Sequence, residues 1–112
     1  MKPDLQNIPL ACNMDVFTAI ERENHIRTTT QLFQAVQNIR ETENGYEFIF
    51  PSSDVPETLT RIAEFISNER LCCPFLKFTL TLDGDPQPIS LILTGPEGTQ
   101  EFLRAEFSEA FV

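Results

Sequence analysis

Two adjacent cysteines, Cys72 and Cys73, are the residues of this chain with the clearest potential for chemistry. They lie in the run Glu69-Arg70-Leu71-Cys72-Cys73-Pro74-Phe75, where a helical pattern ends and a strand pattern begins. The third cysteine, Cys12, and the single histidine, His25, come much earlier in the chain. Three thiols and one imidazole are enough for one soft-metal site, and the thiols alone are enough for a redox switch.

The metal hypothesis uses all four of these side chains. Thiolate sulfur binds soft or borderline ions such as Zn(II), Cu(I), Hg(II) and As(III). We therefore predict a metal or metalloid site formed by Cys12, Cys72 and Cys73, with His25 as a fourth ligand, as in structural zinc sites with three cysteines and one histidine. The spaced cysteine pairs usual in zinc sites are absent. The cofactor is therefore a thiophilic ion whose identity stays open.

Three charged residues could support such a site without binding the ion. Glu21 lies one helical turn before His25 and could orient its other ring nitrogen, although a helix cap explains Glu21 equally well. Glu69 and Arg70 flank the cysteines. Arg70 could bind the last carbonyls of its helix, pair with a carboxylate, or contact an anion.

Two other interpretations of the cysteines stay open. Free cysteine often packs as a small hydrophobic residue, and Cys73 falls on the same helical face as Val55 and Ile66. The chain would then be a non-enzymatic interaction module. Alternatively, Cys72 or Cys73 is a redox thiol, although the negative end of a helix raises a nearby thiol pKa. Nothing marks the orienting group or oxyanion hole of a Cys–His hydrolase, so we lean against an enzyme.

Size and charge limit the partners. The chain has 112 residues, which suits one domain, and 17 acidic against 8 basic residues give a net charge of −9. This charge argues against nucleic acid and anionic membranes. No apolar stretch approaches the ~18 residues of a spanning helix, and the N-terminus lacks the apolar region of a secretory signal. We expect a cytoplasmic protein with free thiols.

The chain reads as one α+β domain, 1–112, with residues 1–14 as an extended N-terminal arm. Capping signals and apolar periodicity predict helices over about 18–37, 55–71 and 97–107. Alternation and turn signals predict strands over 38–42, 46–50, 75–82 and 89–93. The order α-β-β-α-β-β-α predicts a four-stranded, mostly antiparallel sheet with helices on one face.

Apolar stripes identify the expected core and a possible interface. In the second helix we expect Val55, Leu59, Ile62, Ala63 and Ile66 to be buried, with Leu59, Ile62 and Ile66 against Phe48, Phe78, Leu80 and Leu91 of the sheet. The exposed sheet face, or an apolar C-terminal end made by Phe107, Ala110, Phe111 and Val112, could pair with a second copy. We therefore expect a possible homodimer.

The chain resembles a family of small bacterial proteins over about residues 10–107. The shared motifs are Cys12-x-Met14, the Thr18 to His25 helix start, Gly45-Tyr46-x-Phe48, Glu69-Arg70-x-Cys72-Cys73-Pro74-Phe75, Leu93-Thr94-Gly95-Pro96-Glu97-Gly98 and Phe102-Leu103-x-Ala105-Glu106. The Glu-Arg-x-Cys-Cys-Pro-Phe run is the most specific of them. The chain departs from the pattern at Ala19, where such relatives commonly have proline. The resemblance implies a loose link to heavy-metal handling and no established reaction.

Overall fold

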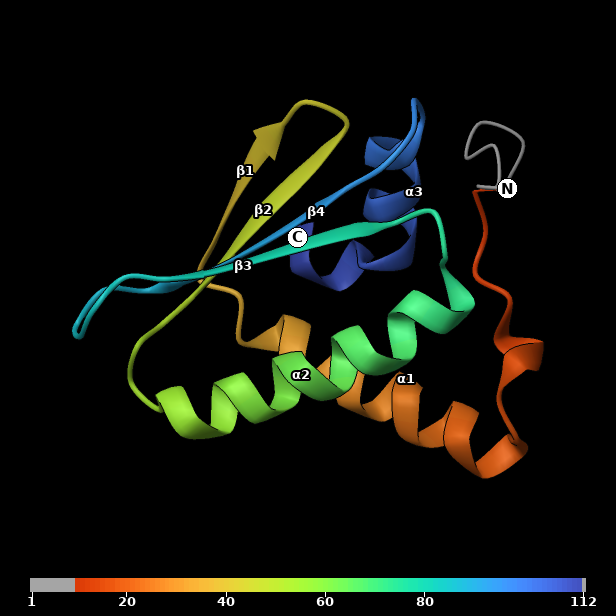
Figure 1. Ribbon diagram of the computed structural model, residues 1–112, viewed down its shortest axis with the longest axis horizontal. Helices are drawn as coiled ribbons and strands as arrows, with labels where there is room; N and C mark the ends of the chain where they lie inside the picture. The colour runs from red at the N-terminus through yellow and green to blue at the C-terminus, as the bar shows by residue number, and fades with distance from the viewer. Residues whose placement is uncertain (1–9, 112) are drawn as a thin grey trace, which may run out of the picture.

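The structure of the protein, a computed structural model, describes residues 10–111 (Figure 1). The larger part of the predicted N-terminal arm, residues 1–9, lies outside the described residues, as does Val112. The main elements are α1 (Ala19–Gln34), β1 (Asn38–Thr42), β2 (Gly45–Phe50), α2 (Val55–Cys72), β3 (Lys77–Leu82), β4 (Ile89–Thr94) and α3 (Thr99–Glu106), with short 3-10 helices η2 (Met14–Val16) and η3 (Ser108–Phe111). The predicted α+β order is confirmed.

All four strands belong to one open sheet with the order β1-β2-β4-β3, and each neighbouring pair is antiparallel. Strands adjacent in sequence, β1 with β2 and β3 with β4, pair as hairpins, and β2 pairs with β4 to join them. Tyr46, Phe48 and Phe50 alternate onto one face of the sheet and are buried, which fits the alternation of the predicted strand 46–50. The three helices cover this face, with α1 and α2 running alongside each other below the sheet in Figure 1.

The first helix begins as its capping signal predicts. The Thr18 hydroxyl accepts a hydrogen bond from the Glu21 backbone N–H, while the Glu21 carboxylate accepts one from the Thr18 N–H. These two bonds satisfy N–H groups that would otherwise lack partners in the first turn. The helix ends at Gln34, three residues before the predicted end, because Ala35 already caps it.

The turn between β1 and β2 consists of Glu43 and Asn44. Asn44 has a φ of 57°, a left-handed conformation that asparagine tolerates better than most residues. Gly45 is already part of β2, and a Cβ atom there would collide with the Leu93 carbonyl of β4. The turn lies between the predicted strands 38–42 and 46–50, as their turn signal indicates. Glycine is needed at position 45 because the strands pack closely there, and the turn conformation itself falls on Asn44.

The core differs from the predicted helical stripe in two places. Ile62 is fully buried as expected, but Ala63 is exposed. Phe65 is fully buried instead, and its ring makes edge contacts with Phe33 and Phe107. The buried face of α2 is therefore rotated slightly from the predicted stripe, and the helix directs the large Phe65 side chain at the aromatic centre of the domain.

The capping signal predicted for the third helix does not form a side-chain cap. Helix α3 begins at Thr99, two residues later than predicted, and its N-cap is Gly98 with a φ of 97° and no side-chain cap. The C-terminal apolar residues are also less available than predicted. Phe107 is buried, and Phe111 packs its ring edge against Tyr46, so the described part of this end belongs to the core.

No helix among residues 10–111 is long and apolar enough to cross a membrane.

A candidate thiol and metal centre

The end of α2 places Glu69, Cys72 and Cys73 together. Residues three apart lie on the same helical face, so Glu69 and Cys72 project in the same direction. The helix ends at Cys72 because Cys73, with φ −125° and ψ 71°, leaves the helical region, which the following Pro74 disfavours. The Cys73 N–H still donates to the Glu69 carbonyl at 2.7 Å. The sulfur atoms of Cys72 and Cys73 therefore project from the same end of the helix and lie 3.8 Å apart.

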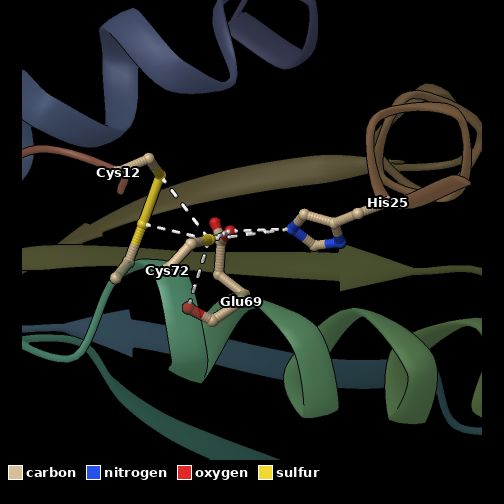
Figure 2. The surroundings of a disulfide bond; sticks show 5 residues. Cys12, His25, Glu69 and Cys72 are labelled. Carbon is tan, nitrogen blue, oxygen red and sulfur yellow. Dashed lines mark hydrogen bonds and ion pairs between the residues drawn. A yellow bond between two sulfur atoms is a disulfide. The ribbon is translucent and has the colours of Figure 1, made fainter. Parts of the chain in front are cut away.

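The N-terminal segment brings the third cysteine to this corner. The backbone N–H of Asn13 donates to the Cys72 carbonyl at 2.8 Å, and the Asn13 side chain caps η2. Cys12 thereby lies next to Cys73, and their sulfur atoms are within bonding distance as a disulfide (Figure 2). The predicted proximity of Cys12 to Cys72 and Cys73 is confirmed. The expectation of three free thiols is not met, because only Cys72 is free in this structure.

Cys72 lies at the centre of the cluster. Its Sγ atom is 4.0 Å from Cys12 Sγ and 3.1 Å from Glu69 Oε1. The side chain is fully buried. Desolvation, reinforced by the negative charge of Glu69, raises the pKa of the Cys72 thiol far above its usual value. The thiol is therefore protonated near neutral pH and donates to the Glu69 carboxylate.

Glu69 is the residue whose importance the sequence understated. It is only 2% exposed, although an isolated acid is almost never buried that fully. Its Oε1 atom accepts hydrogen bonds from Cys72 Sγ and, at 3.1 Å, from His25 Nε2. The sequence feature that points to Glu69 is its position three residues before Cys72. That spacing predicts a shared face but not burial.

His25 reaches the cluster from α1. Its Nε2 atom is 3.9 Å from Cys72 Sγ, and its ring stacks on Phe65, with Phe17 on another side. Its Nδ1 atom is buried and has no hydrogen-bond partner among the described residues. Since Nε2 already bonds to Glu69, His25 is better placed to orient that carboxylate than to bind an ion directly.

The remaining candidate residues lie farther out. Glu21 is exposed and engaged in the helix cap. Arg70 is exposed in the last turn of α2, where a positive charge interacts favourably with the helix dipole. An acid that sequence reasoning missed is Glu106 of α3. Partial desolvation and the charge of Glu69 raise the pKa of its carboxyl. When ionised, Glu106 also contributes to raising the pKa of the Cys72 thiol.

The donor atoms form a compact set. One sulfur from each of Cys12, Cys72 and Cys73, together with a carboxylate oxygen of Glu69, lie within 4.8 Å of one another. Soft sulfur and hard carboxylate oxygen in one buried corner match the donors of thiophilic and borderline ions. The cluster is therefore a set of residues that could hold a metal.

No family model, curated protein or solved structure matches this chain. The resemblance to small bacterial proteins with the Glu-Arg-x-Cys-Cys-Pro-Phe run stays a prediction.

Proposed function

We propose that the reduced protein binds a thiophilic ion through Cys12, Cys72 and Cys73. The observation that supports this most is the convergence of three sulfurs and the Glu69 carboxylate within 4.8 Å, from segments sixty residues apart. A cysteine that serves only as core packing needs no such neighbours. The N-terminal segment is held by a backbone hydrogen bond to Cys72 itself, so Cys12 is positioned for this site in particular.

Ion binding requires the Cys12–Cys73 disulfide to open first. A small dithiol or two monothiols supply the two electrons: the reductant becomes a disulfide, and Cys12 and Cys73 each gain a proton. A cytoplasmic location, which we propose together with this function, provides such thiols. The disulfide and the ion-bound site are then alternative states of the same sulfur atoms.

Charge favours a trivalent metalloid over zinc at this corner. Zn(II) with three thiolates carries a net charge of −1, and this charge would be buried beside the Glu69 carboxylate. Arsenite, As(OH)₃, reacts with three thiols to give a neutral trithiolate and three water molecules. Burying uncompensated charge is costly, so the neutral product suits the site better. The protonated Cys72 thiol also suits this reaction, because its proton combines with a hydroxide of arsenite and leaves as water.

The test is a titration of the reduced protein, prepared anaerobically and without chelator. As(III), Hg(II) and Zn(II) are added to wild type and to Cys72→Ser, and binding is followed by calorimetry with elemental analysis. We expect one As(III) per chain and at least a tenfold loss of affinity in the variant, because the hydroxyl is a hard, neutral donor. Ile62→Val is the matched control, since it disturbs the same core without removing sulfur.

Equal affinity in wild type and Cys72→Ser would reject the site at this residue. If no ion binds and all three thiols react with a labelling reagent only after unfolding, the cysteines are structural. That result supports the alternative of a non-enzymatic interaction module.

One observation favours a second candidate function, thiol redox chemistry. The free Cys72 sulfur lies 4.0 Å from Cys12 Sγ and 3.8 Å from Cys73 Sγ, the two atoms of the disulfide. Attack by the Cys72 thiolate on Cys12 would form a Cys12–Cys72 bond and release Cys73 as a thiolate, with no external oxidant. The raised Cys72 pKa makes this slow at neutral pH. Alkylation of the one free thiol, followed by peptide mapping, tests it: only Cys72 labelled means no exchange.

A further inference from the structure

The two edges of the sheet are protected to very different degrees. Edge strands expose unpaired backbone groups and are usually blunted by charge, proline or a covering segment. Strand β1 carries Arg40 and Glu41, and the Gln100 side chain donates to the carbonyl of Thr42 at 2.7 Å. Strand β3 has a single charged residue, Lys77, at its first position. Its remaining five residues are Phe78, Thr79, Leu80, Thr81 and Leu82.

The outer side of β3 is free for pairing. Its backbone pairs with β4 on one side, and no other backbone or side-chain group among residues 10–111 forms a hydrogen bond to it. Two of its leucines are unusually exposed for apolar residues, Leu80 at 40% and Leu82 at 49%. Both lie on the helix-covered side of the sheet, the side of Phe78. The prediction that Leu80 packs in the core is therefore wrong, because this strand is at the edge.

We propose that two copies of the chain pair through β3 in antiparallel orientation, with the two-fold axis at Leu80. In this register Leu80 lies opposite Leu80 of the second copy, and Phe78 lies opposite Leu82. Directly opposite residues in an antiparallel pair project to the same face. The exposed leucines of both copies then form one apolar strip that continues the two cores.

In the same register, the polar residues of β3 in one copy lie opposite matching polar residues in the other. Thr79 lies opposite Thr81, and Lys77 lies opposite Asp83, the residue that follows the strand. The two-fold axis repeats the Lys77–Asp83 contact at both ends. A register shifted by two residues toward the N-terminus places Lys77 opposite Thr81 and leaves Asp83 without this partner. A shift of two residues the other way places Lys77 opposite Asp85, which lies in the turn beyond the end of the strand. Charge complementarity next to the strand therefore supports a second copy as the occupant, with this register.

Pairing of this kind also preserves the layers of the fold. Because the axis passes through a residue pair, the helices of both copies lie on the same side of one continuous sheet. The two four-stranded sheets merge, and the opposite face stays polar, with the Arg40–Glu47 ion pair and the Ser90 hydroxyl bonded to Glu47. The dimer does not involve the cysteine cluster.

Sedimentation equilibrium of the full chain at physiological ionic strength tests the proposal. We expect a reversible dimer for wild type. Leu80→Lys places like charges directly opposite each other on the axis and should weaken the dimer at least tenfold. Leu71→Lys is the matched control, because Leu71 is 47% exposed but lies on α2. It should leave the dimer unchanged, and circular dichroism should show that both variants fold.

A charge-swap cycle tests the register. Lys77→Asp places two acids opposite each other, and Asp83→Lys places two lysines opposite each other, so each should weaken the dimer roughly tenfold. The double variant exchanges the charges and should restore wild-type affinity. A monomeric wild type, an unaffected Leu80→Lys protein, or a double variant weaker than both single variants would overturn the proposal. A wild type that stays monomeric but binds an extended peptide would also overturn it, in favour of strand addition by another protein.

Discussion

The backbone N–H of Asn13 donates to the carbonyl of Cys72, and this 2.8 Å bond fixes the N-terminal segment against the end of α2. It joins the residue after the first cysteine to the second cysteine. The bond satisfies a carbonyl at the helix C-terminus, which has no partner within the helix. The position of the Cys12 sulfur in the cluster is therefore supported by this main-chain contact as well as by its bond to Cys73.

Removing this contact should loosen the cluster without changing any cysteine. Asn13→Pro eliminates the donor, whereas Asn13→Ala keeps the N–H and loses only the side-chain cap of η2. In a glutathione redox buffer, we expect a smaller fraction of Cys12–Cys73 disulfide in the proline variant than in the alanine variant. As(III) affinity of the reduced proteins should follow the same order. Identical disulfide fractions would show that Cys12 finds its place without the bond.

Glu69 should control the acidity of Cys72. Its negative charge raises the thiol pKa, so Glu69→Gln should lower that pKa, although desolvation keeps it above the ordinary value. The oxidised protein suits this measurement because Cys72 is its only free thiol. Thiolate absorbance should begin to rise at lower pH in the variant. Glu64→Gln, an exposed acid of the same helix, should give the wild-type curve.

The rotated core assignment can be checked at two neighbouring positions. Ile62 is fully buried, so Ile62→Ala should cost ~2–5 kcal/mol of unfolding free energy, as large-to-small core changes do. Ala63 is exposed, so Ala63→Ser should cost about 0.5 kcal/mol or less. Urea melts measure both values. A cost below about 1 kcal/mol for Ile62→Ala would mean that α2 does not pack on the sheet as described.

Gly45 should tolerate no side chain. A Cβ atom at this position would overlap the backbone carbonyl of Leu93, which cannot move without breaking the β2–β4 pairing. We expect Gly45→Ala to cost ~2 kcal/mol or more, because forcing an extra methyl group into a tightly packed site costs ~1–3 kcal/mol and occasionally more. Gly84 is the matched control, since a Cβ atom there meets nothing within 4 Å. Gly84→Ala should be neutral in the same thermal melt, and comparable losses in the two variants would contradict the packing explanation.

Local signals predicted the fold well, whereas tertiary contacts decided the site. Proline at position 74, the Thr18 cap and Asn44 act on their own neighbours, so their effects could be read in the sequence. The burial of Glu69 and the exposure of Leu80 depend on which elements cover them, which local periodicity does not contain. The sequence placed three thiols in one neighbourhood, but which two of them pair follows from how distant segments meet at the end of α2.

The Cys12–Cys73 disulfide also changes the topology of the chain. It spans 61 positions and closes a ring that contains α1, β1, β2 and α2, while β3, β4 and α3 form a tail outside it. In the entropic description, closing a ring of this size raises the free energy of the unfolded chain by about 4 kcal/mol. An ion shared by the same sulfurs would close the same ring. The reduced, empty chain is then the only open form, and we expect it to unfold and be degraded first.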